Sequence, residues 1–212
     1  MPTFLNAAQK ILQNNVRIIG AFLLGLAVGL FCGSIIFLGL PQQTAEIDTG
    51  TLNENDTAAS TLPAAQPARL RIPSVGIVAD FEAPLGIDEK GEVEVPTSFK
   101  TVGWYKYGPT PGELGPAVVL GHVDSINGPE IFYNLRRVEL GDRVEIDRED
   151  GTTAVFEVTR IQNVAQAEFP TLEIYGDIDH AGLRLITCSG TFDRGIRRYS
   201  HNLIVYARLL EE

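Results

Sequence analysis

Cysteine is scarce in this chain of 212 residues, which contains only Cys32 and Cys188. No C-x-x-C pair, H-E-x-x-H helix motif or EF-hand spacing occurs, and these are the patterns that common metal sites use. A glycine-rich phosphate loop is missing as well. We therefore expect neither a bound metal ion nor a cofactor.

Positive charge is also in short supply, with 17 Lys and Arg residues against 27 Asp and Glu residues. The net charge of the whole chain is −10. The first 40 residues hold two positive charges and no negative ones, so residues 41–212 have a net charge of −12. A domain this acidic repels a phosphate backbone, which argues against nucleic acid as a partner.

Charge is absent altogether from the 23 residues 18–40, and these residues are mostly apolar. As a helix at ~1.5 Å per residue the run is long enough to cross a hydrocarbon core of ~30 Å. A buried core helix and a cleaved signal peptide are the alternatives. A signal-peptide core is usually shorter, and no A-x-A cleavage site follows the run. We predict a retained transmembrane helix over residues 18–40.

The flanks of this run indicate its orientation. Lys10 and Arg17 precede it, and no acidic residue occurs before Glu46. Since positive flanks stay in the cytoplasm, we expect residues 1–17 to be cytoplasmic and the rest to lie outside, as in a single-pass type II membrane protein. Cys32 then lies within the membrane, and Cys188 is an unpaired thiol in a compartment that favours disulfides. Such a thiol requires an explanation.

Residues 41–68 are rich in Thr, Ala, Pro and Asp, and they predict a flexible extracytoplasmic linker. From residue 69 to 212 the pattern is mainly that of short strands separated by Gly and Pro turns. The expected strands are residues 69–72, 92–95, 102–105, 116–120, 143–146, 152–161, 183–187 and 203–209, with short helices at 130–135 and 166–169. This pattern is typical of an all-β barrel or sandwich, and we predict a barrel.

Cys188 lies at the end of the apolar run 183–187 and is followed by Ser189 and Gly190. The end of a strand holds a side chain rigidly while the next loop opens it to substrate, as a cysteine nucleophile requires. A buried, inert thiol is the alternative. A free Cys is more often simply buried, and the extracytoplasmic location brings the nucleophile to about equal weight with that alternative.

His122 has the same setting, since the expected strand 116–120 runs into Gly121 and His122. Two strand-end side chains of complementary chemistry suggest a nucleophile and its acid/base partner. His201 is the rival base, because it lies near the same end of the fold. Side chains alternate between the two faces of a strand, so His201 points to the face opposite Ser200 and Asn202, and we prefer His122. His180 follows an Asp-rich stretch that we interpret as a solvated loop.

Three arginines, Arg194, Arg197 and Arg198, follow the only exterior cysteine within ten residues. Exposed arginines are usually solvated. In a domain this acidic, however, their concentration suggests a guanidinium that orients a substrate carbonyl and stabilises an oxyanion.

Several stretches of residues 69–210 resemble the sortases, in particular the class F-like or neighbouring class E-like enzymes. The matching stretches are 71–73 (RIP), 102–105 (VGWY), 108–113 (GPTPGE), 120–125 (LGHVDS), 185–194 (LITCSGTFDR) and 205–207 (VYA). The resemblance implies a closed eight-stranded sortase barrel with short helices, preceded by one N-terminal transmembrane helix. It also implies that Cys188 is the acyl-thioester nucleophile and His122 the acid/base residue.

The arginine position departs from the family pattern. Sortases place an essential arginine commonly twelve to fourteen residues after the cysteine, where this sequence has Ser200, His201 and Asn202. Arg197 and Arg198 come slightly earlier. Strand alternation puts Arg198 on the face of Ser200 and Asn202, so Arg198 is the predicted catalytic arginine.

The resemblance implies a thiol-dependent transpeptidase of the bacterial cell membrane. It would cleave an LPxTG-like sorting signal after its threonine and transfer the acyl group to an amine of cell-wall precursor or of another protein. The exact motif and the acceptor stay open. The alternatives are a non-catalytic, membrane-tethered β-barrel that binds a wall component and a cysteine hydrolase of another family. A thiol–disulfide oxidoreductase lacks its second exposed cysteine.

Overall fold

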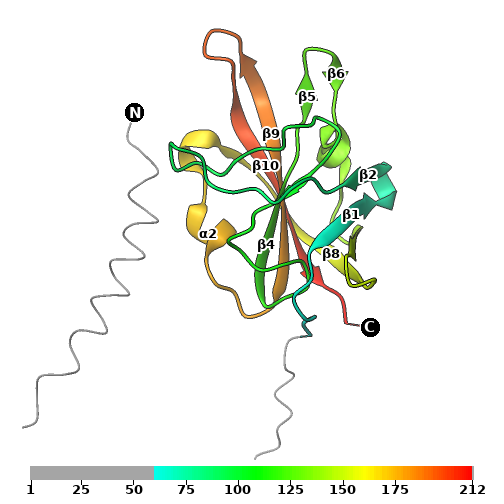
Figure 1. The fold of residues 1–212 in the computed structure, drawn as a ribbon. Coiled ribbons are helices and arrows are strands. Elements are labelled where there is room, and N and C mark those ends of the chain that lie inside the picture. The colour runs from blue at the N-terminus through cyan, green and yellow to red at the C-terminus, as the bar shows by residue number, and fades with distance from the viewer. Residues whose placement is uncertain (1–59, 212) are drawn as a thin grey trace, which may run out of the picture. The chain divides into compact units, whose positions relative to one another are not determined.

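The computed structural model describes residues 60–211, and eight strands of this part form one sheet (Figure 1). The order in the sheet is β2-β1-β7-β8-β10-β9-β4-β3. The bounds are β1 Pro67–Ile72, β2 Ile77–Asp80, β3 Gly103–Trp104, β4 Gly115–Leu120, β7 Arg143–Arg148, β8 Thr153–Ala165, β9 Ala181–Asp193 and β10 Arg198–Leu209.

The remaining elements are small. Strands β5 (Asp124–Ser125) and β6 (Gly128–Pro129) form a separate hairpin. The helices are η1 Pro73–Val75, η2 Tyr133–Arg137, η3 Gln166–Glu168 and α2 Thr171–Tyr175. The prediction of an all-β fold with short helices is therefore confirmed for the described residues.

Neighbouring strands of the sheet are antiparallel except β4 and β9, which run parallel. Their register runs from Gly115 opposite Ala181 to Leu120 opposite Ile186. At this edge of the sheet β4 ends at Leu120, whereas β9 continues to Asp193, so Cys188 lies within β9 and not at a strand end as predicted. This edge also carries the β9–β10 hairpin, and the β5–β6 hairpin projects at the same end of the molecule (Figure 1).

The prediction of a closed barrel is wrong. The two edge strands, β2 and β3, do not pair with each other, and isolated bridges join Phe81 to Val102 and Leu85 to Tyr105. The chain beyond β2 passes through Pro84, which has no amide hydrogen for a ladder, and β3 has only two residues. A continuous ladder cannot form across this gap, so the sheet is barrel-like but open.

Two hydrophobic clusters lie on opposite faces of the central strands. Leu185 and Val205 belong to the larger cluster, whereas their neighbours Ile186 and Ile204 belong to the smaller one, which includes Ile174 of α2. Strands β4, β9 and β10 are thus buried on both faces, as the uninterrupted apolar run 116–120 predicted. The end of β4 and the adjoining first half of β9 are therefore held by packing from both sides.

Most expected strands are present, including the hairpin around Asp150 and Gly151, where Gly151 adopts φ of 84°. The strand expected at residues 92–95 is wrong. This segment makes only one isolated bridge among the described residues, between Ile87 and Val93. It forms a loop in which the Glu94 carboxylate accepts a hydrogen bond from the Gly86 amide. The four-residue strand β2 and helix α2 were not predicted.

The predicted membrane helix at residues 18–40 lies outside the described residues, as does the segment 1–17 that we predicted to be cytoplasmic. Among the helices of residues 60–211, none has the length and apolar character needed to cross a bilayer.

Candidate active site

The parallel pairing of β4 and β9 brings the segments of His122 and Cys188 together. Beyond the Leu120–Ile186 pair, the Gly121 amide donates to the Ile186 carbonyl at 3.2 Å. The Thr187 hydroxyl donates to the Gly121 carbonyl at 2.8 Å. Because parallel strands advance equally, His122 and Cys188 are each two residues past the last pair and occupy the same level of neighbouring chains.

Cys188 is a partly buried free thiol on β9, directly opposite Asn202 of β10. Burial raises the pKa of the thiol, and the carboxylate of Asp124 raises it further, while the guanidinium of Arg198 acts in the opposite direction. The resting site therefore favours the neutral thiol. It also has charged groups of both signs close enough to influence the sulfur.

His122 is held from one side by the segment that precedes β3. Its Nε2 lies 2.7 Å from the Pro96 carbonyl oxygen, and its ring is 4.5 Å from that of Phe99 between centroids. On the main chain, the Phe132 amide donates to the His122 carbonyl at 2.9 Å. The imidazole is therefore fixed in position and orientation.

Asp124 and Tyr199 join two hairpins beside the thiol. The Tyr199 hydroxyl, at the start of β10, donates to Oδ2 of Asp124 in β5. Burial and the hydrogen bond to Asp124 raise the pKa of Tyr199 to about 12, so the phenol remains a donor at neutral pH. Asp124 is thus an engaged, half-buried carboxylate rather than a solvated one, and no sequence signal pointed to Tyr199.

Arg198 begins β10 opposite Asp193, and its Nη2 lies 3.8 Å from Oε2 of Glu92. A register shift separates Tyr199 from His201, so simple alternation from Asn202 does not extend to Arg198. The guanidinium of Arg198 acts to lower the pKa of the Cys188 thiol, less strongly than burial and Asp124 act to raise it.

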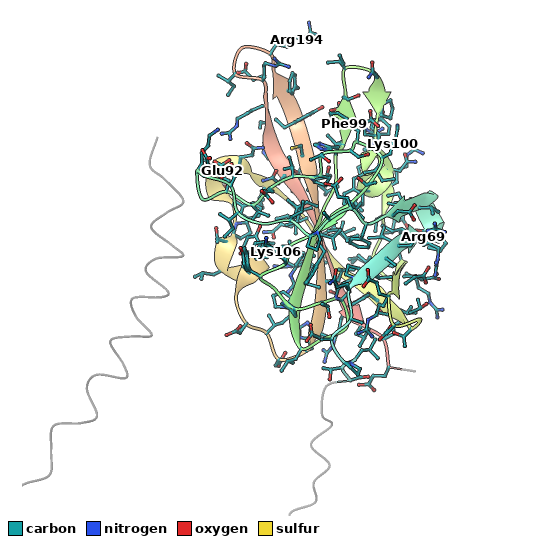
Figure 2. The ribbon with its side chains drawn as sticks, viewed as in Figure 1. Arg69, Glu92, Phe99, Lys100, Lys106 and Arg194 are labelled. Carbon is teal, nitrogen blue, oxygen red and sulfur yellow. The ribbon has the colours of Figure 1, made fainter. Side chains whose placement is uncertain are left out.

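The other two arginines and the other two histidines take no such position. Arg194 and Arg197 lie at the exposed tip of the β9–β10 hairpin, where Arg194 is labelled in Figure 2. His201 is opposite Ser189, so it faces away from the Cys188–Asn202 pair. His180 precedes β9, at the end of that strand remote from Cys188, and contacts Asp179 at 2.8 Å.

No group of three or more His, Cys, Asp or Glu side chains within residues 60–211 is arranged to hold a metal ion. The side chains described above offer a thiol, an imidazole, a carboxylate and a guanidinium. Such a set suits nucleophilic attack on a carbonyl followed by proton transfer.

A protein-family model described as a sortase domain matches residues 70–210. The chain belongs to the sortase family. Members of this family are cysteine transpeptidases, so the resemblance read from the sequence is confirmed at the level of the family. No curated protein matches the sequence of this sortase.

Solved sortase structures share the fold. Streptococcus agalactiae sortase C1, in complex with MTSET, is 20% identical with a TM-score of 0.52, over 70% of this chain and 71% of that one. A lid mutant of Corynebacterium diphtheriae sortase A is 21% identical with a TM-score of 0.53, over 71% and 73%. The Clostridium perfringens sortase D5 transpeptidase is 20% identical with a TM-score of 0.51, over 69% and 79%. At these identities the similarity establishes the fold alone.

Proposed function

We propose that this sortase is a class F-like transpeptidase that cleaves an LPxTG-like sorting signal after its threonine and joins the acyl group to an amine. The observation that supports the proposal is the register of β4 and β9, in which His122, just after β4, and Cys188, within β9, are each two residues past the Leu120–Ile186 pair. A cysteine nucleophile with an acid/base partner at hand is what acyl transfer requires.

In the proposed reaction the Cys188 thiolate attacks the threonine carbonyl and forms a tetrahedral oxyanion. Arg198 orients that carbonyl and stabilises the negative charge on its oxygen. The intermediate collapses as the C–N bond breaks, and His122, as imidazolium, protonates the leaving glycine amine. The acceptor amine then attacks the thioester and loses a proton to His122, and the Cys188 thiolate leaves.

The rate of the proposed reaction depends on the fraction of molecules that hold Cys188 as a thiolate and His122 as an imidazolium. With ordinary values of ~8.5 for a thiol and ~6.5 for an imidazole, only about 1% of molecules hold both charged forms at pH 7 if the groups titrate independently. The raised pKa of Cys188 reduces the thiolate fraction further. We therefore expect slow turnover.

The proposed setting is the outer face of a bacterial cell membrane. A transmembrane helix at residues 18–40 and the linker that follows it would hold the catalytic domain, whose first strand starts at Pro67, near its substrates, both of which are expected at the cell surface. The partners in this proposal are sorting-signal proteins and either a peptidoglycan precursor or a protein amine.

The test is incubation of the full chain in detergent micelles with fluorogenic LPxTG and LAxTG peptides and diglycine, with the ligated product identified by mass spectrometry. Cys188→Ala should abolish ligation, and His122→Ala and Arg198→Ala should each lower kcat by about 10² or more. His201→Ala and Arg194→Ala are the matched controls and should stay near wild type.

The outcomes separate the candidate functions. Full turnover by Cys188→Ala would reject the assigned chemistry. Saturable peptide binding without turnover by the wild-type chain would favour the non-catalytic binding module, and cleavage without transfer to diglycine would favour a cysteine hydrolase.

A further inference from the structure

The turn formed by residues 96–101 packs against His122 from a distant part of the sequence. Pro96 supplies the carbonyl that faces Nε2 of His122, and Phe99 supplies the ring beside the imidazole. Phe99 is also tied to the chain that follows His122, because the Ile131 amide donates to the Phe99 carbonyl at 3.2 Å. This turn is the only described contact that determines which ring nitrogen of His122 holds a proton.

The Glu82 carboxylate organises this turn from within. It accepts hydrogen bonds from the Thr97 amide at 2.8 Å, the Ser98 amide at 3.2 Å and the Thr101 hydroxyl at 2.7 Å. Burial acts to raise the pKa of Glu82, but these hydrogen bonds outweigh it and the pKa is lowered. Three donors that converge on one anion fix the turn that carries Pro96 and Phe99.

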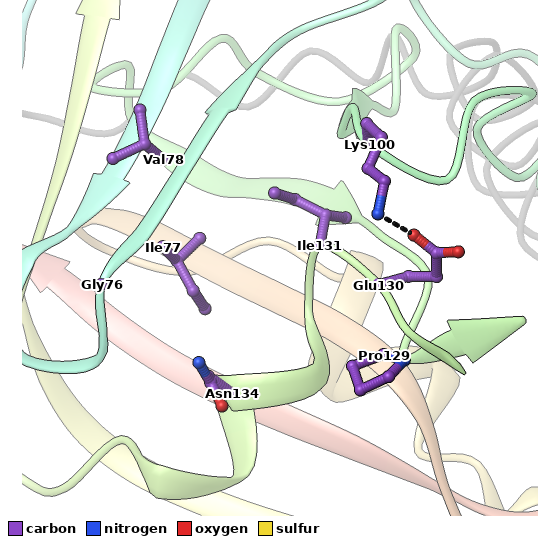
Figure 3. A pocket seen from close by; sticks show the side chains of 8 residues that line it. All are labelled: Gly76, Ile77, Val78, Lys100, Pro129, Glu130, Ile131 and Asn134. Carbon is purple, nitrogen blue, oxygen red and sulfur yellow. Dashed lines mark ion pairs between the residues drawn. The ribbon is translucent and has the colours of Figure 1, made fainter. Parts of the chain in front are cut away.

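An ion pair fastens the turn to the segment after His122. The Lys100 ammonium lies 2.6 Å from Oε2 of Glu130, whose side chain is only 5% exposed (Figure 3). The other carboxylate oxygen accepts from the Ser125 hydroxyl at 2.6 Å, and the Glu130 amide donates to the Val123 carbonyl at 3.1 Å. Glu130 is therefore rigidly placed next to His122 in space.

A carbonyl oxygen only accepts hydrogen bonds, so the short contact to Pro96 requires a proton on Nε2 of His122. A neutral imidazole has one N–H, which leaves the lone pair on Nδ1. Within residues 60–211, Pro96 is the only hydrogen-bond partner of the His122 ring, so Nδ1 is free to exchange a proton.

We propose that Glu82 and the Lys100–Glu130 pair are positioning residues for His122, which hold the Pro96 carbonyl on Nε2 and make Nδ1 the nitrogen that transfers protons. The inference rests on the proposed function. Neutral His122 takes the proton of the Cys188 thiol on Nδ1 and becomes an imidazolium. It then gives this proton from Nδ1 to the leaving amine, while Nε2 keeps its own proton throughout.

The first test is independent of turnover. The full chain in micelles, labelled with ¹⁵N-histidine, is studied by two-bond ¹H–¹⁵N correlation spectra above the titration range of imidazole, with His180→Gln and His201→Gln variants for assignment. The neutral His122 should be the Nε2–H tautomer in the wild type. In Glu82→Ala it should become a mixture of tautomers. An Nδ1–H tautomer in the wild type would overturn the proposal, even if the enzyme is active.

The second test is kinetic. Glu82→Ala and Lys100→Met should lower kcat about 10- to 100-fold with a smaller change in KM, because a misplaced catalytic group costs mainly the chemical step. Lys100→Arg retains the ion pair and should recover kcat to within about threefold of wild type.

Arg69→Met is the matched control, since it removes an exposed ion pair with Asp80, at 2.7 Å, on the β1–β2 hairpin (Figure 2). It should leave kcat unchanged. Wild-type kcat in both Glu82→Ala and Lys100→Met, with circular dichroism spectra like that of the wild type, would refute the positioning role. Absence of ligation by the wild type would instead refute the proposed function, and the tautomer measurement would still decide the assignment.

Discussion

The Thr187 hydroxyl links the strand of the nucleophile to the segment of the proposed base, so its removal tests how the two are coupled. Thr187 is 4% exposed and donates to the Gly121 carbonyl at 2.8 Å. Thr187→Val preserves the shape of the side chain but leaves that carbonyl without this donor. Loss of a buried hydrogen bond with one partner left unsatisfied costs about 1–3 kcal/mol.

For a domain of this size, a loss of about 2 kcal/mol lowers the Tm by roughly 4–8 °C. Trp104, the only tryptophan of the chain, is 7% exposed, so its fluorescence reports unfolding of the domain directly. Thr187→Ser is the matched control. It keeps the hydroxyl and loses one buried methyl group, worth about 0.8 kcal/mol before any cavity cost.

We expect Thr187→Val to lower kcat about tenfold, because the His122 segment is no longer fixed to β9, and Thr187→Ser to stay near wild type. The measurements are thermal unfolding by tryptophan fluorescence and kcat for peptide ligation. If Thr187→Val matches wild type in both Tm and kcat, the hydrogen bond does not couple the two strand ends.

Three further predictions concern the thiol and the glycine beside His122. Asp124→Asn removes a charge that raises the pKa of Cys188, so it should increase the rate at which iodoacetamide alkylates Cys188 at pH 7, measured by peptide mapping. In the wild type this alkylation rate should rise steadily with pH above neutrality, since burial raises the thiol pKa, and a plateau reached below pH 7 would contradict a raised pKa. Gly121→Ala places a Cβ atom 2.6 Å from a ring carbon of the fully buried Phe132 and should cost about 1–3 kcal/mol in unfolding free energy, whereas Gly108→Ala, with a nearest contact of 3.5 Å, should cost less.

The sequence allowed the candidate nucleophile and base to be proposed because each follows a strongly apolar run of residues, 183–187 and 116–120. Such uninterrupted apolar runs indicate strands that are buried on both faces. The burial of β4 and of the first half of β9 confirms this prediction. Which strands are neighbours is set by long-range pairing. The parallel pairing of β4 with β9 therefore had to come from the resemblance or from the structure.

Local patterns failed where a loop imitated a strand. The alternation of residues 92–95 has the period of a strand, but Pro96 follows directly and its carbonyl is used by His122 instead of a sheet. The Pro96–His122 contact joins residues 26 positions apart, and the Tyr199–Asp124 contact between two hairpins joins residues 75 positions apart. No periodicity encodes such contacts, so this part of the site was beyond sequence reasoning.

The central claim is that the sulfur of Cys188 forms the covalent intermediate of acyl transfer, with His122 as its partner. The most direct measurement is intact-protein mass spectrometry of the full chain, which is incubated briefly with the peptide substrate and then quenched with acid. The account predicts an added mass equal to the acyl portion ending in threonine, mapped to Cys188, and discharge of this adduct by diglycine as ligated product appears. Ligated product formed by Cys188→Ala, or an acyl group mapped to any other residue, would contradict the account.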